Sequence, residues 1–157
     1  MLEIERKFLI DGFPIGLDLF REVEIEQGYV SIKPEVRIHK AVDKTRGRTD
    51  YRLTLKDDGD LTRTEIKTDI SDNFYYDAMG MLAGKPIVKE YKAYKLGAWI
   101  LEVCRVDAGT QNEFYYAEIE FPTEEDAKSF VPPKFLGREI TYNDDYKMKN
   151  YWKRTRL

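Results

Sequence analysis

The sequence predicts an α+β protein in which an antiparallel β-sheet carries most of the structure and a few helices pack beside it. Three observations favour this fold class. Several segments alternate polar and apolar residues with a period of two, as strands with one buried face do. An Asp58-Gly59 pair between two such segments is typical of a hairpin turn, which joins antiparallel strands. Helix signals are fewer than strand signals, so we expect more strands than helices.

The first expected strand, residues 3–10, places Glu3, Glu5 and Lys7 on one face. The same alternation predicts strands at residues 36–39, 51–56, 61–70 and 116–121. Each of them also carries charged side chains at consecutive same-face positions. These positions are Arg37 and His39, then Arg52 and Lys56 on either side of Thr54, then Arg63, Glu65 and Lys67, and finally Glu118 and Glu120.

Three helices are expected after or between the strands. Ser71 or Asp72 is a suitable N-cap for the first, which should end near Gly84. The apolar face of this helix is expected to consist of Phe74, Ala78 and Met81 or Leu82. Thr123 begins a capping-box pattern for a second helix that Pro132-Pro133 ends. A third helix should start at Thr141 or Asn143 and run through Tyr151.

Length and composition limit the class of protein. A chain of 157 residues suits one domain over residues 1–157. With 26 Lys and Arg against 29 Asp and Glu, the net charge of -3 argues against nucleic acid as a partner. No apolar run approaches the roughly 20 residues of a membrane span. The charged N-terminus lacks a signal-peptide core, and Cys104 alone cannot form an internal disulfide, so we expect a cytoplasmic protein.

The charged faces need an explanation. A polar strand face ordinarily meets water, and that interpretation holds for any one strand taken alone. The pairs Glu3/Glu5 and Glu118/Glu120, however, place like charges side by side, which is unfavourable without a cation. Carboxylates are ligands for Mg²⁺ or Mn²⁺. If one curved sheet closed on itself, all these faces would enter one lumen together with Arg37, Lys56, Arg63 and Lys89. A compact polyanion such as a phosphate chain is the ligand that this arrangement suggests.

Glu3-Ile4-Glu5-Arg6-Lys7 resembles the E-x-E-x-K motif of the CYTH, or triphosphate tunnel metalloenzyme, family. Further segments follow the order of that family over nearly the whole chain. They are Gln27-Gly28-Tyr29, Glu35-Val36-Arg37, Leu53-Thr54-Leu55-Lys56, Arg63-Thr64-Glu65, Val88-Lys89, Ala117-Glu118-Ile119-Glu120-Phe121, and the tail segments Phe130-Val131-Pro132-Pro133 and Gly137-Arg138-Glu139-Ile140-Thr141. The chain is therefore similar to the small bacterial inorganic triphosphatases.

The resemblance implies a closed antiparallel β-barrel of about eight strands with helices packed outside. It also implies hydrolysis of a small-molecule triphosphate, most simply inorganic tripolyphosphate, with Mg²⁺ or Mn²⁺ as cofactor. Glu3, Glu5, Glu118 and Glu120 would bind the metal. Substrate-binding positions would be Lys7, Arg37, His39, Lys56, Arg63 and Lys67. Lys89 is the candidate base, and Glu65 would serve either as a further metal ligand or as the partner of a base. Some relatives pair, so the resemblance allows a homodimer.

Several positions depart from the family pattern. His39 and Tyr91 stand where many members have arginine, and Lys67 stands where a further glutamate is common. Glu102 replaces an aspartate, and Asn143-Asp144-Asp145-Tyr146 lacks the usual Asp and Arg. Because these changes remove positive charge from the phosphate side, the activity could be reduced or directed at another substrate.

Other functions remain open on the sequence. A class IV adenylyl cyclase shares the fold, and a thiamine or nucleoside triphosphatase would need an apolar mouth that Trp99 or Trp152 could supply. From another class, the protein could bind polyphosphate or nucleotide without catalysis. Cys104 is expected to be a small core residue rather than a nucleophile. The tail from Tyr151 to Arg156 could close one end of the tunnel or fray.

Overall fold

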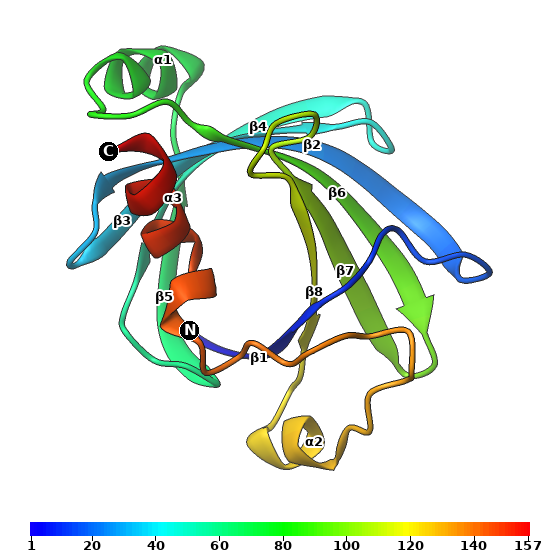
Figure 1. Cartoon of the computed structure of the whole chain (residues 1–157). Coiled ribbons are helices and arrows are strands. Elements are labelled where there is room, and N and C mark those ends of the chain that lie inside the picture. The colour runs from blue at the N-terminus through cyan, green and yellow to red at the C-terminus, as the bar shows by residue number, and fades with distance from the viewer.

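The computed structural model describes residues 1–157, and its eight strands form one closed antiparallel barrel (Figure 1). The strands are β1 (Leu2–Leu9), β2 (Asp18–Ser31), β3 (Glu35–Asp43), β4 (Arg48–Lys56), β5 (Thr62–Asp69), β6 (Ile87–Leu96), β7 (Trp99–Val106) and β8 (Phe114–Glu120). Their order around the barrel is β1-β5-β4-β3-β2-β6-β7-β8, and β8 pairs with β1 to close it. The closed eight-stranded barrel is confirmed.

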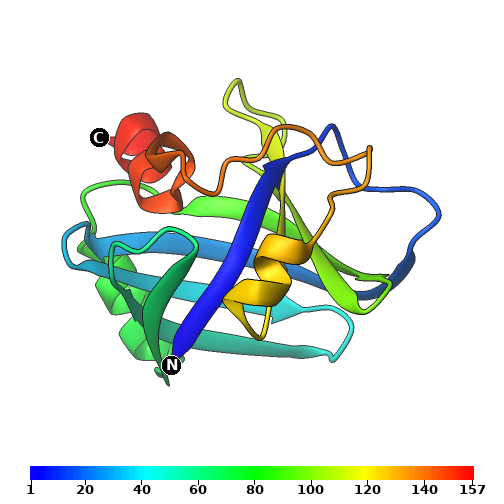
Figure 2. The same cartoon turned by 90° about the horizontal axis from the view of Figure 1, so that it is seen from below.

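Four short helical elements lie outside the barrel wall or over one end of it. They are α1 (Asp72–Gly80), α2 (Glu124–Ser129), the 3-10 helix η1 (Asp144–Tyr146) and α3 (Met148–Arg156). Figure 2 shows α2 against the outer side of β1, with η1 and α3 at one end of the barrel. No helix is both long and apolar enough to cross a membrane.

Local signals in the sequence explain where the helices begin. Ser71 accepts a hydrogen bond from the Phe74 amide, and Thr123 accepts one from the Asp126 amide, so both expected N-caps are confirmed. The third expected helix is divided, because Lys147 has an extended backbone between η1 and α3. Between β4 and β5, Asp57 accepts hydrogen bonds from the amides of Gly59 and Thr64 and thereby closes the expected hairpin turn.

The predicted apolar face of α1 was wrong. Phe74 is 49% exposed and Met81 is 86% exposed, whereas Tyr75 is fully buried. The Tyr75 ring lies 5.3 Å from that of Tyr51, and its hydroxyl donates to Glu26 at 3.2 Å. The adjacent Tyr76 also contacts the barrel, because its ring lies 6.0 Å from that of Tyr51 and its hydroxyl accepts from Lys40. Two consecutive tyrosines thus dock the helix, so helical periodicity gave little information about its orientation.

The apolar core lies in two places, on the outer side of the barrel wall and beneath α3, where Tyr29, Cys104 and Tyr116 also face the barrel interior. One cluster joins the outer side of the wall, including Phe8, Val103 and Ile119, to Ala127 of α2. A second cluster packs Trp152 and Tyr151 of α3 against Tyr29 and Ile87. With apolar packing supplied from these two sides, the strands direct their charged faces into the lumen.

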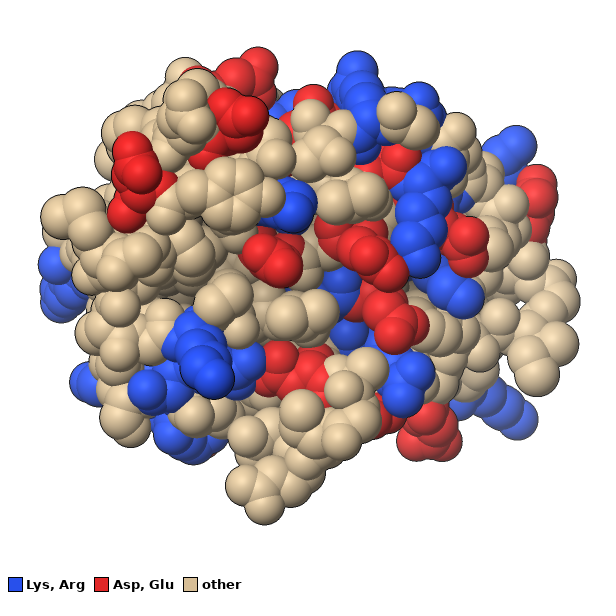
Figure 3. All heavy atoms as spheres, turned by 90° about the horizontal axis from the view of Figure 1, so that it is seen from above, with Lys and Arg blue, Asp and Glu red and all other residues tan.

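Charged side chains on the outer surface pair locally with each other. Figure 3 shows acidic and basic groups interspersed over one such face. Lys44 bonds Glu24, Lys92 bonds Glu22 and Arg105 bonds Glu90 across neighbouring strands. These residues lie on the solvent-exposed outer faces of the strands, as polar residues of an ordinary sheet do. They are distinct from the charged side chains that point into the barrel.

Candidate active site

A cavity of about 240 Å³ occupies the barrel interior, and we call it the tunnel. Eleven of the twelve candidate residues line it: Glu3, Glu5, Lys7, Arg37, Lys56, Arg63, Glu65, Lys67, Lys89, Glu118 and Glu120. They come from six of the eight strands, which are β1, β3, β4, β5, β6 and β8. A seventh strand, β7, adds Glu102 and Cys104 to the tunnel wall. The alternation of each strand therefore brings charges distant in sequence into one enclosed space.

His39 is the exception among the predicted residues, because it does not line the tunnel. It pairs with Arg52 across β3 and β4. Burial, followed by the nearby charges of Arg37 and Lys89, lowers the pKa of His39 to about 3. The imidazole is therefore neutral near pH 7 and does not replace the positive charge of an arginine.

The acidic cluster comprises Glu3, Glu5, Glu118 and Glu120. Strand register creates it, because Glu5 lies directly opposite Glu120 and Lys7 lies opposite Glu118. Burial, and then the charges of Glu118 and Glu3, raise the pKa of Glu5 well above its usual range. Burial and the charges of Glu3 and Glu65 also raise the pKa of Glu120. Carboxylates are thus concentrated on this side of the tunnel, and Lys56, Arg63 and Lys7 are paired with members of the cluster.

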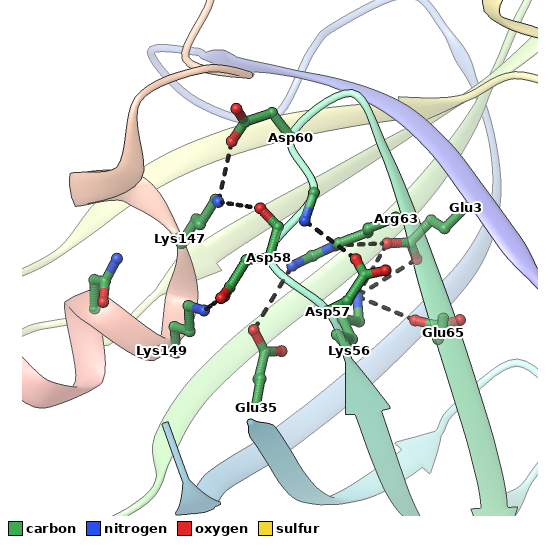
Figure 4. Close-up of polar contacts among 12 residues, drawn as sticks. Glu3, Glu35, Lys56, Asp57, Asp58, Asp60, Arg63, Glu65, Lys147 and Lys149 are labelled. Atoms are coloured by element: carbon green, nitrogen blue, oxygen red, sulfur yellow. Dashed lines mark hydrogen bonds and ion pairs between the residues drawn. The ribbon is translucent and has the colours of Figure 1, made fainter. Parts of the chain in front are cut away.

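Lys56 and Arg63 connect the acidic cluster to the rest of the tunnel (Figure 4). Lys56 Nζ lies 3.1 Å from Glu3 Oε1 and 3.1 Å from Glu65 Oε2. Arg63 lies 3.2 Å from Glu3 and 3.6 Å from Glu35, a buried carboxylate that the sequence analysis had not assigned to the site. Both cations are held between carboxylates in the tunnel wall.

Glu65 is tightly bound to two lysines. It lies 3.1 Å from Lys56 and 3.1 Å from Lys67. Although burial opposes ionisation, Lys56 and then Lys67 lower the pKa of Glu65 to about 2. Its carboxylate therefore stays ionised near pH 7 and is paired with Lys56 and Lys67.

Lys7, Arg37 and Lys89 form the cationic side of the tunnel. Lys7 Nζ donates to the Tyr146 carbonyl at 2.9 Å and lies 3.7 Å from Glu118. Lys89 Nζ donates to the Tyr116 hydroxyl at 3.0 Å, and the buried Nε of Arg37 has no partner. Burial, with Arg37 and Lys7 nearby, lowers the pKa of Lys89 against the opposing effects of Cys104 and Glu118. The Lys89 amine, with its lowered pKa, and the Arg37 guanidinium, with its unpartnered Nε, both line the cavity.

Tyr91 on β6 and Glu102 on β7 stand at two of the positions where the sequence departs from the family pattern. The Tyr91 hydroxyl donates a very short hydrogen bond to Glu102. Burial, followed by the charges of Glu118 and Glu120, raises the pKa of Glu102 to about 7, although Tyr91 opposes the rise. A neutral hydroxyl replaces an arginine here and takes the acidic neighbour as its partner.

The tunnel continues into an apolar cleft that we call the second mouth. It has a volume of about 430 Å³ and shares Tyr91, Glu102 and Glu120 with the tunnel. Trp99 lines it and packs edge-on against Phe121 with 5.0 Å between ring centroids. Trp152 does not line this cleft. It is 3% exposed and its indole donates to the Lys85 carbonyl at 2.8 Å, so it is a packing residue.

The other end of the tunnel is covered by η1 and the start of α3. Lys147 lies 3.0 Å from Asp60 in the β4–β5 turn, and Lys149 bonds Asp58 in the same turn (Figure 4). Lys147 also lies 3.0 Å from Asp144. Lys147 and Met148 both line the tunnel. The C-terminal tail therefore covers one tunnel end, and the charge pairs with the β4–β5 turn hold it there.

The acidic cluster is chemically suited to a divalent metal ion. Its donors are all carboxylate oxygens, which Mg²⁺ and Mn²⁺ prefer. Burial and then the neighbouring carboxylates raise the pKa values of Glu5 and Glu120, and a bound cation would oppose both effects. As the side chains stand, no three acidic, imidazole or thiol groups are arranged as a complete coordination site, and Glu3 is bonded to Lys56 and Arg63 instead.

Comparisons with known proteins agree with this geometry. An inorganic triphosphatase from Nitrosomonas europaea is 32% identical over 152 residues, which cover 95% of each chain. A crystal structure of the inorganic triphosphatase NE1496 superposes with a TM-score of 0.67 at 28% identity, covering 95% of this chain and 93% of that one. A Bacillus halodurans protein provisionally assigned as an adenylate cyclase shares the fold, with a TM-score of 0.54 at 16% identity over 84% and 93% of the two chains. No protein-family model matches the sequence.

Proposed function

This chain belongs to the CYTH, or triphosphate tunnel metalloenzyme, family, and on that basis we propose that it hydrolyses inorganic tripolyphosphate within the tunnel. One observation carries the proposal: acidic and cationic side chains from seven strands converge on a single enclosed cavity in a protein 32% identical to an inorganic triphosphatase. A metal-bound phosphate chain presents both kinds of charge in one compact ligand, as this cavity requires.

The cationic residues bind and orient the substrate in this proposal. Lys7, Arg37, Lys56 and Arg63 would hold the phosphate oxygens, and the free Nε of Arg37 has no competing partner. Phosphoryl transfer requires mainly positioning and charge stabilisation from a protein, and fixed cations in a closed barrel provide both. Glu35 and Glu65 would keep Arg63 and Lys56 in place.

Lys89 is the proposed general base. Water would attack the terminal phosphorus while the bond to the bridging oxygen breaks, and the water proton would pass to Lys89 Nζ. Burial favours the neutral amine that this step needs. Glu3, Glu5, Glu118 and Glu120 would hold Mg²⁺ or Mn²⁺, which when bound would neutralise part of the phosphate charge.

Release of phosphate from tripolyphosphate, with Mg²⁺ or Mn²⁺, tests the proposal. We expect turnover by the wild type. Lys89→Ala should lower kcat by at least about 100-fold, because general bases contribute about 10²–10⁴ to rates. Glu5→Gln should abolish metal-dependent turnover and leave a folded protein. Glu24→Gln, on the outer surface, is the matched carboxylate control and should behave as wild type.

Tripolyphosphate binding without phosphate release would replace the proposed hydrolase with the noncatalytic binding protein. Calorimetry of metal and tripolyphosphate together distinguishes these two functions. Full turnover by Lys89→Ala would leave the hydrolase in place and remove Lys89 as its base.

The second mouth favours one alternative substrate class, a triphosphate ester whose organic group carries an aromatic ring. Trp99 and Phe121 form an apolar wall next to the tunnel, where the organic group of such an ester could lie. A higher kcat/KM on a nucleoside triphosphate than on tripolyphosphate would make the ester the preferred substrate.

A further inference from the structure

Tyr116 lies between the two lysines of the cationic side of the tunnel. It is on β8, is 2% exposed and lines the cavity. Its hydroxyl accepts a hydrogen bond from Lys89 Nζ at 3.0 Å. Its ring lies under Lys7, whose Nζ is 4.1 Å from the ring centroid, a geometry that attracts a cation to the face of the ring. One side chain thus contacts both ammonium groups by different chemical interactions.

A neighbour on β7 bears on how the Tyr116 hydroxyl is oriented. Cys104 lies directly opposite Tyr116 across β7 and β8. A tyrosine hydroxyl has a single proton to donate. When that proton is directed to the Cys104 sulfur, the lone pairs of the oxygen remain for an N–H of Lys89. The rotation of the Lys89 amine about its terminal bond is then limited by this contact.

We infer that Tyr116 is a positioning residue for hydrolysis, which orients the Lys89 amine through its hydroxyl and holds Lys7 through its ring. The inference rests on the proposed function, since it concerns how the two lysines act on a phosphate chain. With one N–H of Lys89 directed to Tyr116, the remaining positions on Nζ face the tunnel. Lys7 is kept where its charge reaches the same cavity.

Tyr116→Phe separates the two roles, because it removes the hydroxyl and keeps the ring. We expect kcat on tripolyphosphate to fall about tenfold, a part of the contribution of a well-placed base, while KM changes less than about twofold. Tyr116→Leu removes the ring as well, so KM should also rise, by about fivefold or more.

The pH profile provides a readout that a merely structural role would not move. A hydroxyl that accepts from Lys89 favours the ammonium form, so its loss should shift the rising limb of kcat/KM to lower pH. The charged or titratable groups around Lys89 are Lys7 on β1, Arg37 and His39 on β3, Cys104 on β7, and Tyr116 and Glu118 on β8. All but Tyr116 are unchanged in Tyr116→Phe.

Tyr75→Phe is the matched control, because Tyr75 is also a buried tyrosine with a hydrogen-bonded hydroxyl. It lies on the outer side of the barrel, where its hydroxyl donates to Glu26. Its kcat, KM and pH profile should equal those of the wild type. A double-mutant cycle completes the test. If Tyr116 acts through Lys89, Tyr116→Phe should lower kcat less than about twofold in a Lys89→Ala background.

Wild-type kcat and an unshifted limb in Tyr116→Phe would overturn the inference and leave the proposed function intact. So would an equal loss of activity in Tyr116→Phe and Tyr75→Phe. Absence of turnover by the wild type would instead overturn the proposed function. In that event, calorimetry measures how tightly each variant binds tripolyphosphate. Weaker binding by Tyr116→Leu, with wild-type binding by Tyr75→Phe, supports the contact between Tyr116 and Lys7. Equal binding by both variants contradicts it.

Discussion

Individual charges in the tunnel are displaced from their ordinary ionisation by burial and by one another. The pKa values of Glu5 and Glu102 are raised by burial first and by neighbouring carboxylates second, whereas that of Glu65 is lowered because two lysines bind it. Neighbouring side chains on the same wall therefore differ in charge state near neutral pH.

Glu102 makes stability depend on pH. Its pKa is about 7 in the folded protein against 4.5 ordinarily, so the folded state keeps a proton that the unfolded state releases. The contribution is fully present below pH 4.5 and is lost as the pH rises to about 7. Glu102→Gln should flatten this decline by up to about 3 kcal/mol, because glutamine does not titrate. The amide oxygen still accepts from Tyr91, so the local structure is kept. Urea unfolding at pH 5 and pH 8 measures it.

Glu24→Gln is the control for that measurement, since Glu24 is an exposed carboxylate paired with Lys44 on the outer surface. It should retain the wild-type decline. An unchanged pH dependence in Glu102→Gln would show that Glu102 is ionised across this range, and the decline would then have to come from Glu5 and Glu120.

Among the elements, α3 is the one that depends most on single polar contacts. Arg156 binds both carboxylate oxygens of Asp107 at 2.7 Å, and Tyr151 donates to the same carboxylate. The Trp152 indole is bonded to the Lys85 carbonyl, next to the start of β6. Because Asp107 is buried, the loss of its partner would leave an uncompensated charge under the helix.

Arg156→Ala should therefore lower the free energy of unfolding by about 2–3 kcal/mol. Arg154→Ala is its matched control on the same helix, since Arg154 is exposed and donates only to the Asp145 carbonyl at 3.1 Å. That variant should change stability by less than about 0.5 kcal/mol. Urea unfolding of both variants tests the expectation, and equal effects would mean that apolar packing alone docks α3.

At the scale of the whole molecule, the barrel balances its own charges in the absence of ligand. Lys56 and Arg63, the proposed phosphate binders, are bonded to Glu3, a proposed metal ligand. Metal and phosphate together would take over both sets of partners, while either alone would leave the other set unpaired. The two ligands should therefore favour each other's binding.

We expect Mg²⁺ and tripolyphosphate together to raise the melting temperature by about 5–10 °C at concentrations near 100 times the dissociation constant. Each ligand alone should give a smaller increase, and the joint increase should exceed their sum. Differential scanning calorimetry measures this. Equal ionic strength from NaCl is the control, and an increase with NaCl as large as with the ligands would reduce the effect to general screening.

The period of two in the strands determined from sequence alone which charges share a face, and the caps at Ser71 and Thr123 determined where helices begin. These are local properties, set by neighbours a few residues away. The resemblance to a known family supplied the number of strands and the closure of the barrel.

Only the tertiary structure decided which of those side chains meet. Strand register and barrel closure place Tyr116 beside Lys89 and Lys7, pair Tyr91 with Glu102, and leave His39 outside the tunnel. Alternation gives a side chain its face but not its neighbour across the lumen, because that neighbour comes from a strand far away in sequence. For the same reason the docking of α1 through Tyr75 could not be obtained from helical periodicity.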